Sequence, residues 1–143
     1  GIGTDRTAVH PNSGVCFIEN GYRDSIHHVQ NYSAVTGACL MIKKELFDKL
    51  GGLDEKLAVA YNDVDFCLRL RRRGLLNVYV PQALLFHYES KSRGYDDKGE
   101  RHERFLRESQ LFRDRWQNII DDGDPYYNVN LSKEVPWKPE IKL

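Results

Sequence analysis

The run AVTGACLMI, residues 34–42, is apolar at nearly every position. A strand with one face in water alternates apolar and polar side chains, whereas a strand covered on both faces is apolar throughout. Directly after it, KKELFDKL at residues 43–50 places Leu46, Phe47 and Leu50 on one side of a short helix. The run and the helix together predict an α/β fold, in which helices cover a sheet.

Three glycines refine this prediction. Gly37 interrupts the apolar run, which favours either a close backbone approach or a bulge. Gly51 and Gly52 follow the 43–50 helix and predict a left-handed stop. Both features are backbone arrangements that residues with a side chain adopt less readily.

The stretch AYNDVDFCLRLRRRG, residues 60–74, sets an Asn and two Asp directly before an apolar, Arg-rich helical run. Asn62 is a favourable helix N-cap, and Asp65 is placed to reach back to it in a capping box. Arg69, four residues after Asp65, predicts an ion pair along the helix, and Gly74 predicts its end. The expected buried stripe consists of Val64, Cys67 and Leu68.

Asp63 and Asp65 spell the acidic D-x-D pattern that often binds a divalent metal. At a helix start, however, residues i and i+2 point about 200° apart, so the two carboxylates are expected to diverge. Asp63 then sits in the first turn, where the helix field favours the ionised carboxylate that a general base for a hydroxyl needs. The simpler interpretation, in which both acids only stabilise the helix start, stays open at this point.

The remaining segments complete a predicted mixed sheet with flanking helices. Residues 77–81 predict a strand, and residues 83–88 predict a second extended run. A polar loop at 89–100 leads to a long helix from about residue 101 to 120, whose core-facing stripe consists of Phe105, Phe112, Trp116 and Ile119. The first and last segments predict a strand at 15–18, a polar loop at 22–33 and an extended tail at 122–143.

Composition limits the class of protein. The 143 residues are enough for one core, and 21 Lys plus Arg balance 21 Asp plus Glu. A net charge of zero argues against nucleic acid as a partner. No apolar run reaches the roughly 18–20 residues of a transmembrane helix, and the first residues carry no signal-peptide pattern.

The three cysteines, Cys16, Cys39 and Cys67, show no metal-binding spacing. An odd number of cysteines without a disulfide framework fits a reducing compartment. Cys39 and Cys67 lie among apolar residues and are expected to pack in the core.

Four blocks resemble, in their order and spacing, the inverting nucleotide-sugar glycosyltransferases of family 2, in particular bacterial rhamnosyltransferase-like enzymes that build surface polysaccharides. The blocks are VTGACLMIKKELFDKLGGLDEKL, AYNDVDFCLRLRRRG, VYVPQALLFHYESKSRGY and RW…DPYYNVNL, and they lie within residues 31–131. The resemblance implies a GT-A (Rossmann-like) fold, of which residues 31–121 would be the acceptor-binding and catalytic half. No nucleotide-binding βαβ pattern precedes them, so residues 1–30 are expected to form leading coil and a short strand.

In this family an acidic motif at the start of the acceptor-side helix supplies the catalytic base. The resemblance therefore implies that Asp63 accepts the proton of an acceptor hydroxyl, with Asn62 in place of the family's usual Glu. His87 matches a His that completes the metal site in some members and is the implied metal ligand. The implied cofactor is a divalent cation, Mg²⁺ or Mn²⁺, expected only together with an N-terminal half that this sequence does not contain.

The resemblance also implies contacts with the substrates. Gly37 and Ala38 resemble the tight strand end beside the donor sugar, where small residues let the sugar approach. Tyr61 could line the acceptor pocket or pack under the helix, and the sequence leaves both open. In the family the loop over the donor diphosphate, where a guanidinium suits bidentate phosphate binding, corresponds here to Ser90, Ser92 and Arg93.

The implied partners are a nucleotide-sugar donor and a glycan acceptor, in bacterial surface polysaccharide synthesis in the cytoplasm or at the cytoplasmic face of the membrane. The isolated chain is expected to be inactive, because the donor half is missing. Two alternatives stay open: a non-catalytic carbohydrate-binding or interaction module, and one subunit of a split transferase. A truncated sheet edge would also permit a homodimer.

Overall fold

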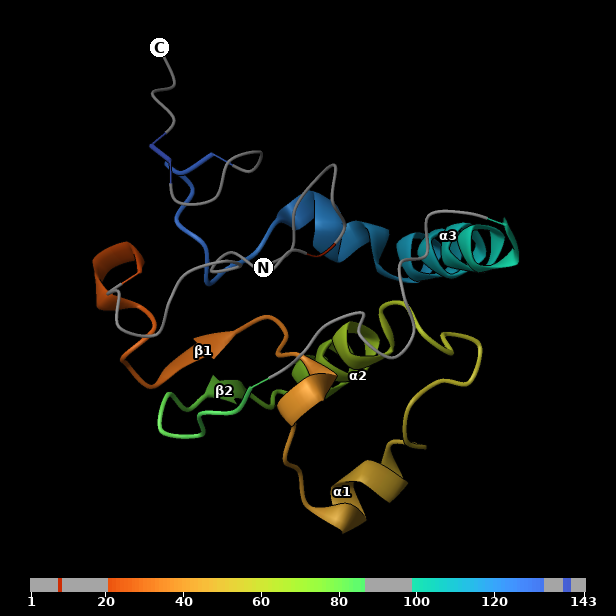
Figure 1. Ribbon diagram of the computed structural model, residues 1–143, viewed down its shortest axis with the longest axis horizontal. Coiled ribbons are helices and arrows are strands. Elements are labelled where there is room, and N and C mark those ends of the chain that lie inside the picture. Colours follow the sequence, from red (N-terminus) through yellow and green to blue (C-terminus); the bar gives the residue numbers. More distant parts are fainter. Residues whose placement is uncertain (1–7, 9–20, 87–98, 133–137, 140–143) are drawn as a thin grey trace.

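A computed structural model describes residues 8, 21–86, 99–132 and 138–139 of the chain. The elements within them are, in order, η1 (Tyr22–Asp24), β1 (Gln30–Tyr32), η2 (Gly37–Cys39), α1 (Lys44–Lys49), α2 (Asn62–Arg71), β2 (Asn77–Tyr79) and α3 (Gly99–Asp122). These residues form a mixed α/β arrangement with a small two-stranded sheet and one long helix towards the C-terminal end (Figure 1). The predicted α/β class is confirmed at this level.

Helix α2 lies between α3 on one side and α1 on the other (Figure 1). The apolar cluster that it shares with α3 consists of Leu57, Leu68, Phe112, Trp116 and Ile120. The cluster towards α1 consists of Leu50, Phe66 and Leu70, with Leu46 and Phe47 packed against it. A helix with apolar side chains on two sides is a buried helix, which explains why Phe66, Cys67 and Leu68 are all fully buried.

The two flanking helices form close to their predicted bounds of 43–50 and 101–120. Gly51 and Gly52 follow α1 with φ angles of 77° and 66°, which confirms the left-handed stop. The stripe predicted on α3 does face the core, since Trp116 is fully buried. Local periodicity and glycine chemistry were therefore sufficient to predict both helices.

The strand predicted at 34–42 is wrong. A short 3-10 turn, η2, forms there instead, flanked by extended backbone at Thr36 and Leu40. A segment joins a sheet only where a neighbouring strand takes its backbone hydrogen bonds, and no strand of the described residues lies beside it. Some of its N–H groups are satisfied locally: Thr36 Oγ1 accepts from the Ala38 N–H at 3.3 Å, and the Thr36 carbonyl from the Cys39 N–H at 3.4 Å.

The side chains of this run are also less buried than predicted. Met41 is 98% exposed, and Leu40 and Ile42 are partly buried against the cluster between α1 and α2. Cys39 is exposed, so its predicted core position is wrong, whereas Cys67 is fully buried as predicted. The described part of the chain thus covers this run on one side only.

The sheet pairs β1 with β2 in antiparallel register. β2 confirms the strand predicted at 77–81, whereas β1 lies in the segment 22–33, for which a loop is predicted, and that prediction is wrong. The sequence of β1 is Gln-Asn-Tyr, too polar and short to show a strand pattern. It becomes a strand because β2 supplies backbone partners and because Tyr32 meets Tyr79 edge-on, at a ring distance of 5.9 Å.

Outside these elements the described chain is mostly coil. Residues 83–86 of the predicted run 83–88 form no strand, and the strand predicted at 15–18 lies outside the described residues. Turns and an isolated bridge between Leu131 and Pro139 follow α3. In the described part of the chain no helix has the length and apolarity needed to span a membrane. The homodimer through a sheet edge stays a prediction.

Candidate functional site

Asp63 holds the turn η2 against the start of α2. Its Oδ2 accepts a hydrogen bond from the Gly37 N–H at 2.7 Å, and its Oδ1 accepts one from the Val64 N–H at 2.8 Å. A Cβ added to Gly37 would lie 3.2 Å from the Cβ of Asp63, tighter than nine in ten real Cβ contacts. A close contact therefore exists at Gly37, but its partner is the side chain of Asp63 and not another backbone segment.

The carboxylate of Asp63 keeps the capacity to accept further hydrogen bonds. The residue is only half-buried, and each oxygen of an ionised carboxylate has two lone pairs. One lone pair on each oxygen is used by the bonds from Gly37 and Val64. A hydroxyl group can therefore hydrogen-bond to a carboxylate whose orientation is already fixed by the backbone.

Helix α2 begins in a different way from the one predicted. Its N-cap is Tyr61, which has a left-handed conformation with φ 62° and ψ 6° and makes no side-chain cap hydrogen bond. Asn62 bonds its own neighbour, since its Oδ1 accepts from the Asp63 N–H at 2.7 Å. The predicted capping box is wrong, because the side chain of Asp65 turns into the core, where stronger, charged donors hold it.

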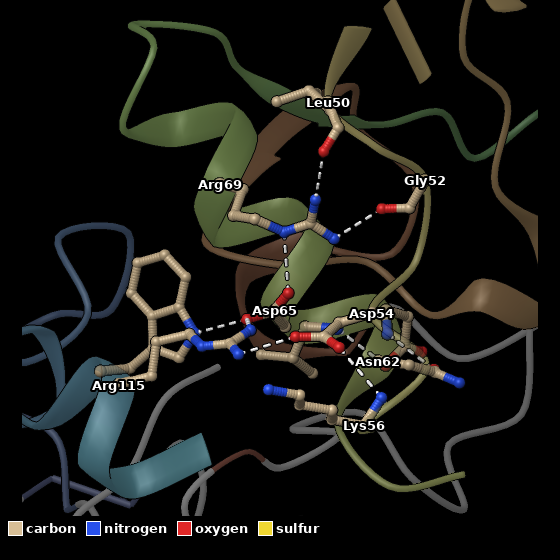
Figure 2. A network of polar contacts seen from close by, with 11 residues as sticks. Leu50, Gly52, Asp54, Lys56, Asn62, Asp65, Arg69 and Arg115 are labelled. Atoms are coloured by element: carbon tan, nitrogen blue, oxygen red, sulfur yellow. Dashed lines mark hydrogen bonds and ion pairs between the residues drawn. The ribbon is translucent and has the colours of Figure 1, made fainter. Parts of the chain in front are cut away.

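Asp65, the second acid of the D-x-D pattern, is completely buried. Its Oδ1 accepts from Arg115 Nη1 at 2.7 Å and from Trp116 Nε1 at 2.9 Å, both on α3. Its Oδ2 accepts from Arg69 Nε at 2.8 Å, which confirms the predicted i, i+4 pair. Figure 2 shows the Asp65 carboxylate between the guanidinium groups of Arg69 and Arg115. Asp65 is thus a link between two helices.

The network continues into the loop after α1 (Figure 2). Arg69 also donates to the carbonyl oxygens of Leu50 and Gly52, at 2.8 and 2.7 Å. Arg115 also donates to Asp54 Oδ2, at 2.7 Å. Because every charged group in this network has an opposite charge or a carbonyl as partner, the burial of its charges is compensated.

Two pKa shifts follow from these contacts. Burial opposes the charge of Arg115, but the hydrogen bonds from Arg115 to Asp65 and Asp54 outweigh burial, so the pKa of Arg115 is raised. The backbone N–H of Lys56 and the side chain of Arg115 both donate to Asp54, and together they lower the pKa of the Asp54 carboxyl despite its partial burial. The ion pair between Arg115 and Asp54 is therefore charged at neutral pH.

These contacts separate the roles of the two acids. Asp63 and Asp65 diverge as expected, the first towards η2 and the second into the core. In the ranges that the structure describes, no group of three or more His, Cys, Asp or Glu is arranged to hold a metal ion. The two acids of the D-x-D pattern thus have different surroundings, and Asp63 is the accessible one.

The ring of Tyr61 packs under α3. It stacks on Phe112 with a centroid distance of 4.8 Å and lies 6.1 Å from the ring of Phe105. Of the two roles that the sequence leaves open for Tyr61, the packing role is the one with contacts in the structure. A role in lining an acceptor pocket stays a prediction.

Glu108 on α3 is a residue that reasoning from the sequence missed. It is only 4% exposed, and its Oε2 accepts from the backbone N–H groups of Val59, at 3.2 Å, and of Ala60. The signal was available, because Glu108 lies three residues after Phe105 and four before Phe112 and therefore on the apolar stripe. A charged side chain within such a stripe is seldom buried without partners.

The other predicted site residues fall into two groups. Ala38 is exposed in η2, next to Gly37 and therefore on the turn that Asp63 holds. The predicted donor-side residues lie outside the described residues: His87, Ser90, Ser92 and Arg93.

A buried thiol lies below this turn. Cys67 Sγ donates to the carbonyl oxygen of Val35 at 3.7 Å. Burial raises the pKa of the Cys67 thiol, and the negative charge of Asp63 raises it as well. The thiol is therefore protonated at neutral pH and serves to pack α2 against the segment before η2.

A second buried link joins the sheet to the segment after α3. Ser33 is fully buried, and its Oγ donates to Asp124 Oδ1 at 2.6 Å and accepts from Arg71 Nη1 at 2.9 Å. The amide of Asn77 donates to the carbonyl oxygen of Ser33 at 2.9 Å. One serine thus connects β1, α2, β2 and the start of the C-terminal tail.

Comparison with known proteins shows that this chain is similar to short parts of longer proteins. It is 50% identical over 115 residues to the protein y4gI of Sinorhizobium fredii, which covers 80% of this chain and 12% of that protein. It is 38% identical over 110 residues to the O-antigen biosynthesis protein RfbC of Myxococcus xanthus, covering 72% of this chain and 8% of the relative. No family model and no solved structure matches the chain.

A third relative carries an enzyme name. Over 62 residues the chain is 39% identical to the N-acetylglucosaminyl-diphospho-decaprenol L-rhamnosyltransferase of Mycobacterium tuberculosis, covering 43% of this chain and 20% of that enzyme. The chain therefore spans a fifth or less of the length of these three relatives. Among its partial homologues are proteins named for glycosyl transfer and for polysaccharide synthesis.

Proposed function

We propose that this chain is the acceptor-binding and catalytic half of a GT-A glycosyltransferase domain of the family 2 inverting class. The parent protein would transfer a sugar from a nucleoside-diphosphate sugar to a hydroxyl of a glycan acceptor, in bacterial surface polysaccharide synthesis at the cytoplasmic side. The names of the relatives support the reaction class. One structural observation supports the site assignment. The Asp65 carboxylate is enclosed in ion pairs, whereas the Asp63 carboxylate stays accessible and is held in a fixed orientation.

In the proposed reaction Asp63 is the general base. The acceptor hydroxyl hydrogen-bonds to a remaining lone pair of the Asp63 carboxylate, and its proton moves there as its oxygen attacks the anomeric carbon of the donor. The new carbon–oxygen bond forms on one face of the sugar while the bond to the diphosphate breaks on the other, so the configuration inverts. The nucleoside diphosphate leaves with the electron pair of the broken bond.

Two structural features suit Asp63 to this role. The N–H groups of Gly37 and Val64 hold its carboxylate in one orientation, which a proton acceptor requires. The turn beside it, Gly37–Cys39, begins with two small residues, Gly37 and Ala38. That turn is the proposed place for the donor sugar, because little side-chain bulk stands next to the base.

A divalent cation, Mg²⁺ or Mn²⁺, is proposed to accompany the donor. The described residues do not fit such an ion, since both oxygens of Asp63 take backbone N–H donors and Asp65 is enclosed by Arg69, Arg115 and Trp116. We therefore propose that most of its ligands lie in a separate donor-binding half, with His87 as the contribution of this chain. None of the steps assigned to Asp63 depends on the ion.

The donor-binding half is proposed to belong to a longer parent protein. Relatives in which this chain corresponds to 8–20% of the length have ample room for such a half. The donor diphosphate bound by that half is proposed to contact three residues of this chain: Ser90, Ser92 and Arg93. The isolated chain would then transfer no sugar.

The test uses the full-length protein that contains this sequence. Transfer from a panel of radiolabelled nucleoside-diphosphate sugars, including a rhamnose nucleotide, identifies the donor. Asp63→Asn should then lower kcat by about 10²–10⁴-fold, the usual contribution of a general base, with the donor KM nearly unchanged. The matched control is Asp48→Asn, an exposed acid on α1 that pairs with Lys44, which should keep the wild-type rate.

The outcomes separate this proposal from the alternatives. Wild-type turnover in Asp63→Asn would contradict the assignment of the base. Sugar binding without transfer by the full-length protein, unchanged in Asp63→Asn, would instead favour a carbohydrate-binding module. Transfer that needs a second, co-purifying chain would favour the split transferase.

A further inference from the structure

Helix α3 binds the backbone just before α2 through one buried acid. The Oε2 atom of Glu108 accepts from the N–H groups of two consecutive residues, Val59 at 3.2 Å and Ala60. Its other oxygen lies 3.7 Å from Nε of Arg104, one turn earlier on the same helix. Glu108 is 4% exposed, so these contacts lie within the core and not at the surface.

The residue that follows is held by the same face of α3. The ring of Tyr61 contacts Phe105, three residues before Glu108, and Phe112, four residues after it. Residues at i, i+3 and i+7 share one face of a helix. Three consecutive residues, 59 to 61, are thus held by one face of α3. Glu108 binds the backbone of the first two, and Phe105 and Phe112 contact the ring of the third.

The conformation fixed in this way is an unfavourable one. Tyr61 has φ 62°, a left-handed conformation that costs free energy in a residue with a bulky side chain. Such conformations persist only where the surroundings determine them, and they are common at functional sites. The carbonyl of Tyr61 accepts the first hydrogen bond of α2, from the Asp65 N–H at 2.8 Å, so its conformation sets the direction in which α2 starts.

We propose that Glu108 is a positioning residue for the base Asp63. By holding the N–H groups of Val59 and Ala60, Glu108 keeps Tyr61 in its left-handed conformation. The first turn of α2 then presents the Asp63 carboxylate to the Gly37 N–H and to the acceptor. This inference rests on the proposed function, in which Asp63 accepts the proton of the acceptor hydroxyl.

The test compares Glu108→Gln and Glu108→Asp with Glu103→Gln, a change at an exposed acid of the same helix, all in the full-length protein. Glu108→Gln keeps the size of the side chain but weakens its bonds to the two N–H groups, since a neutral acceptor replaces a charged one. We expect kcat per folded molecule to fall about 10- to 100-fold, as misplacement of a catalytic group does, with the donor KM within about twofold. Glu103→Gln should match the wild type.

Hydrogen exchange supplies a readout that does not depend on turnover. Amide exchange in the segment 57–62, followed by mass spectrometry, should accelerate in Glu108→Gln and not in Glu103→Gln. If exchange accelerates but kcat is unchanged, Glu108 is only structural and the proposal is overturned. If Glu108→Gln does not fold, Glu108→Asp, which keeps the charge on a shorter side chain, serves for both measurements.

The turnover of Asp63→Asn, measured beside that of the Glu108 variants, distinguishes a failure of the positioning role from a failure of the proposed function. Full turnover in the Glu108 variants, together with a large loss in Asp63→Asn, would reject the positioning role alone. Full turnover in Asp63→Asn would reject the general base, and the role of Glu108 with it.

Discussion

The carboxylate of Asp65 lies 2.9 Å from the indole nitrogen of Trp116, although 51 residues separate them in sequence. Both side chains are fully buried. Arg115 donates to the same carboxylate oxygen. Asp65 on α2 therefore binds α3 through two donors, the charged guanidinium of Arg115 and the neutral indole N–H of Trp116. Asp63 lies two residues before Asp65, in the first turn of the same helix.

Removal of Asp65 should therefore destabilise the fold strongly. Asp65→Ala leaves the guanidinium groups of Arg69 and Arg115 without their shared acid, and loss of one partner of a buried pair costs about 3–5 kcal/mol. Urea unfolding followed by tryptophan fluorescence measures the change. The matched control is Asp48→Ala on α1, an exposed i, i+4 pair with Lys44 that should cost less than about 1 kcal/mol. Equal losses in the two variants would show that Asp65 is not the link between the helices.

Acid should weaken the fold partly through Asp54. The pKa of Asp54 is lowered in the folded state, mainly by the Lys56 N–H and then by Arg115. Its contribution to the free energy of unfolding is therefore present above the ordinary pKa of 3.8 and is lost as the pH falls through the lower, folded value. Unfolding in urea at several pH values, from about pH 6 downwards, measures the slope. Asp54→Asn should flatten that slope, whereas Glu55→Gln, at an exposed neighbour, should leave it in place.

Gly37→Ala should lower turnover more than stability. The added Cβ would lie 3.2 Å from the Asp63 Cβ and 3.5 Å from its Oδ2, so the carboxylate must move and its bond to the residue 37 N–H weakens. In the full-length protein we expect kcat to fall about tenfold, with a stability change below about 1 kcal/mol because the site is partly exposed.

Gly51→Ala is the control for Gly37→Ala, because it is expected to lower stability without affecting turnover. No atom lies within 4 Å of an added Cβ there, but φ is 77°, which disfavours any side chain. It should cost about 1 kcal/mol of stability and leave kcat per folded molecule unchanged. If Gly37→Ala affects stability and turnover in the same proportion as Gly51→Ala, the contact with Asp63 has no role in catalysis.

The two cysteines of the described residues should differ in reactivity. The thiolate is the reactive form, and burial raises the pKa of Cys67, with the charge of Asp63 acting in the same direction. Cys39 is exposed. Iodoacetamide labelling with peptide mass spectrometry should modify Cys39 in the native protein and Cys67 only after unfolding. Comparable native labelling of both would mean that α2 opens readily or that Cys67 is not buried.

The helices could be predicted from the sequence, because their signals are local. Leu46, Phe47 and Leu50 mark one side of α1, and Gly51 and Gly52 mark its end. Of the two described strands, β2 could be predicted from its own residues and β1 could not. β1 is polar and becomes a strand only because β2 pairs with it, whereas the apolar run 34–42 has no strand beside it in the described chain.

The site shows the same contrast between local and distant contacts. The divergence of Asp63 and Asp65 follows from helix geometry alone, and the structure confirms it. The capping box fails because Arg115 and Trp116, 50 and 51 residues away, are better partners for Asp65 than the helix start. The position of Glu108 on the apolar stripe is a local signal, but its partners could not be predicted, since they are backbone N–H groups almost 50 residues earlier.

The long separation of these partners has a consequence for the order of folding. A nascent chain emerges from the ribosome N-terminal end first, so α2 is synthesised well before α3 and before Asp124. Until then Asp65 has neither Arg115 nor Trp116, and Ser33 lacks the acid that lies 91 residues further on. During synthesis, the buried acid of α2 and the apolar side of α2 that faces α3 therefore stay without these partners until α3 has been made.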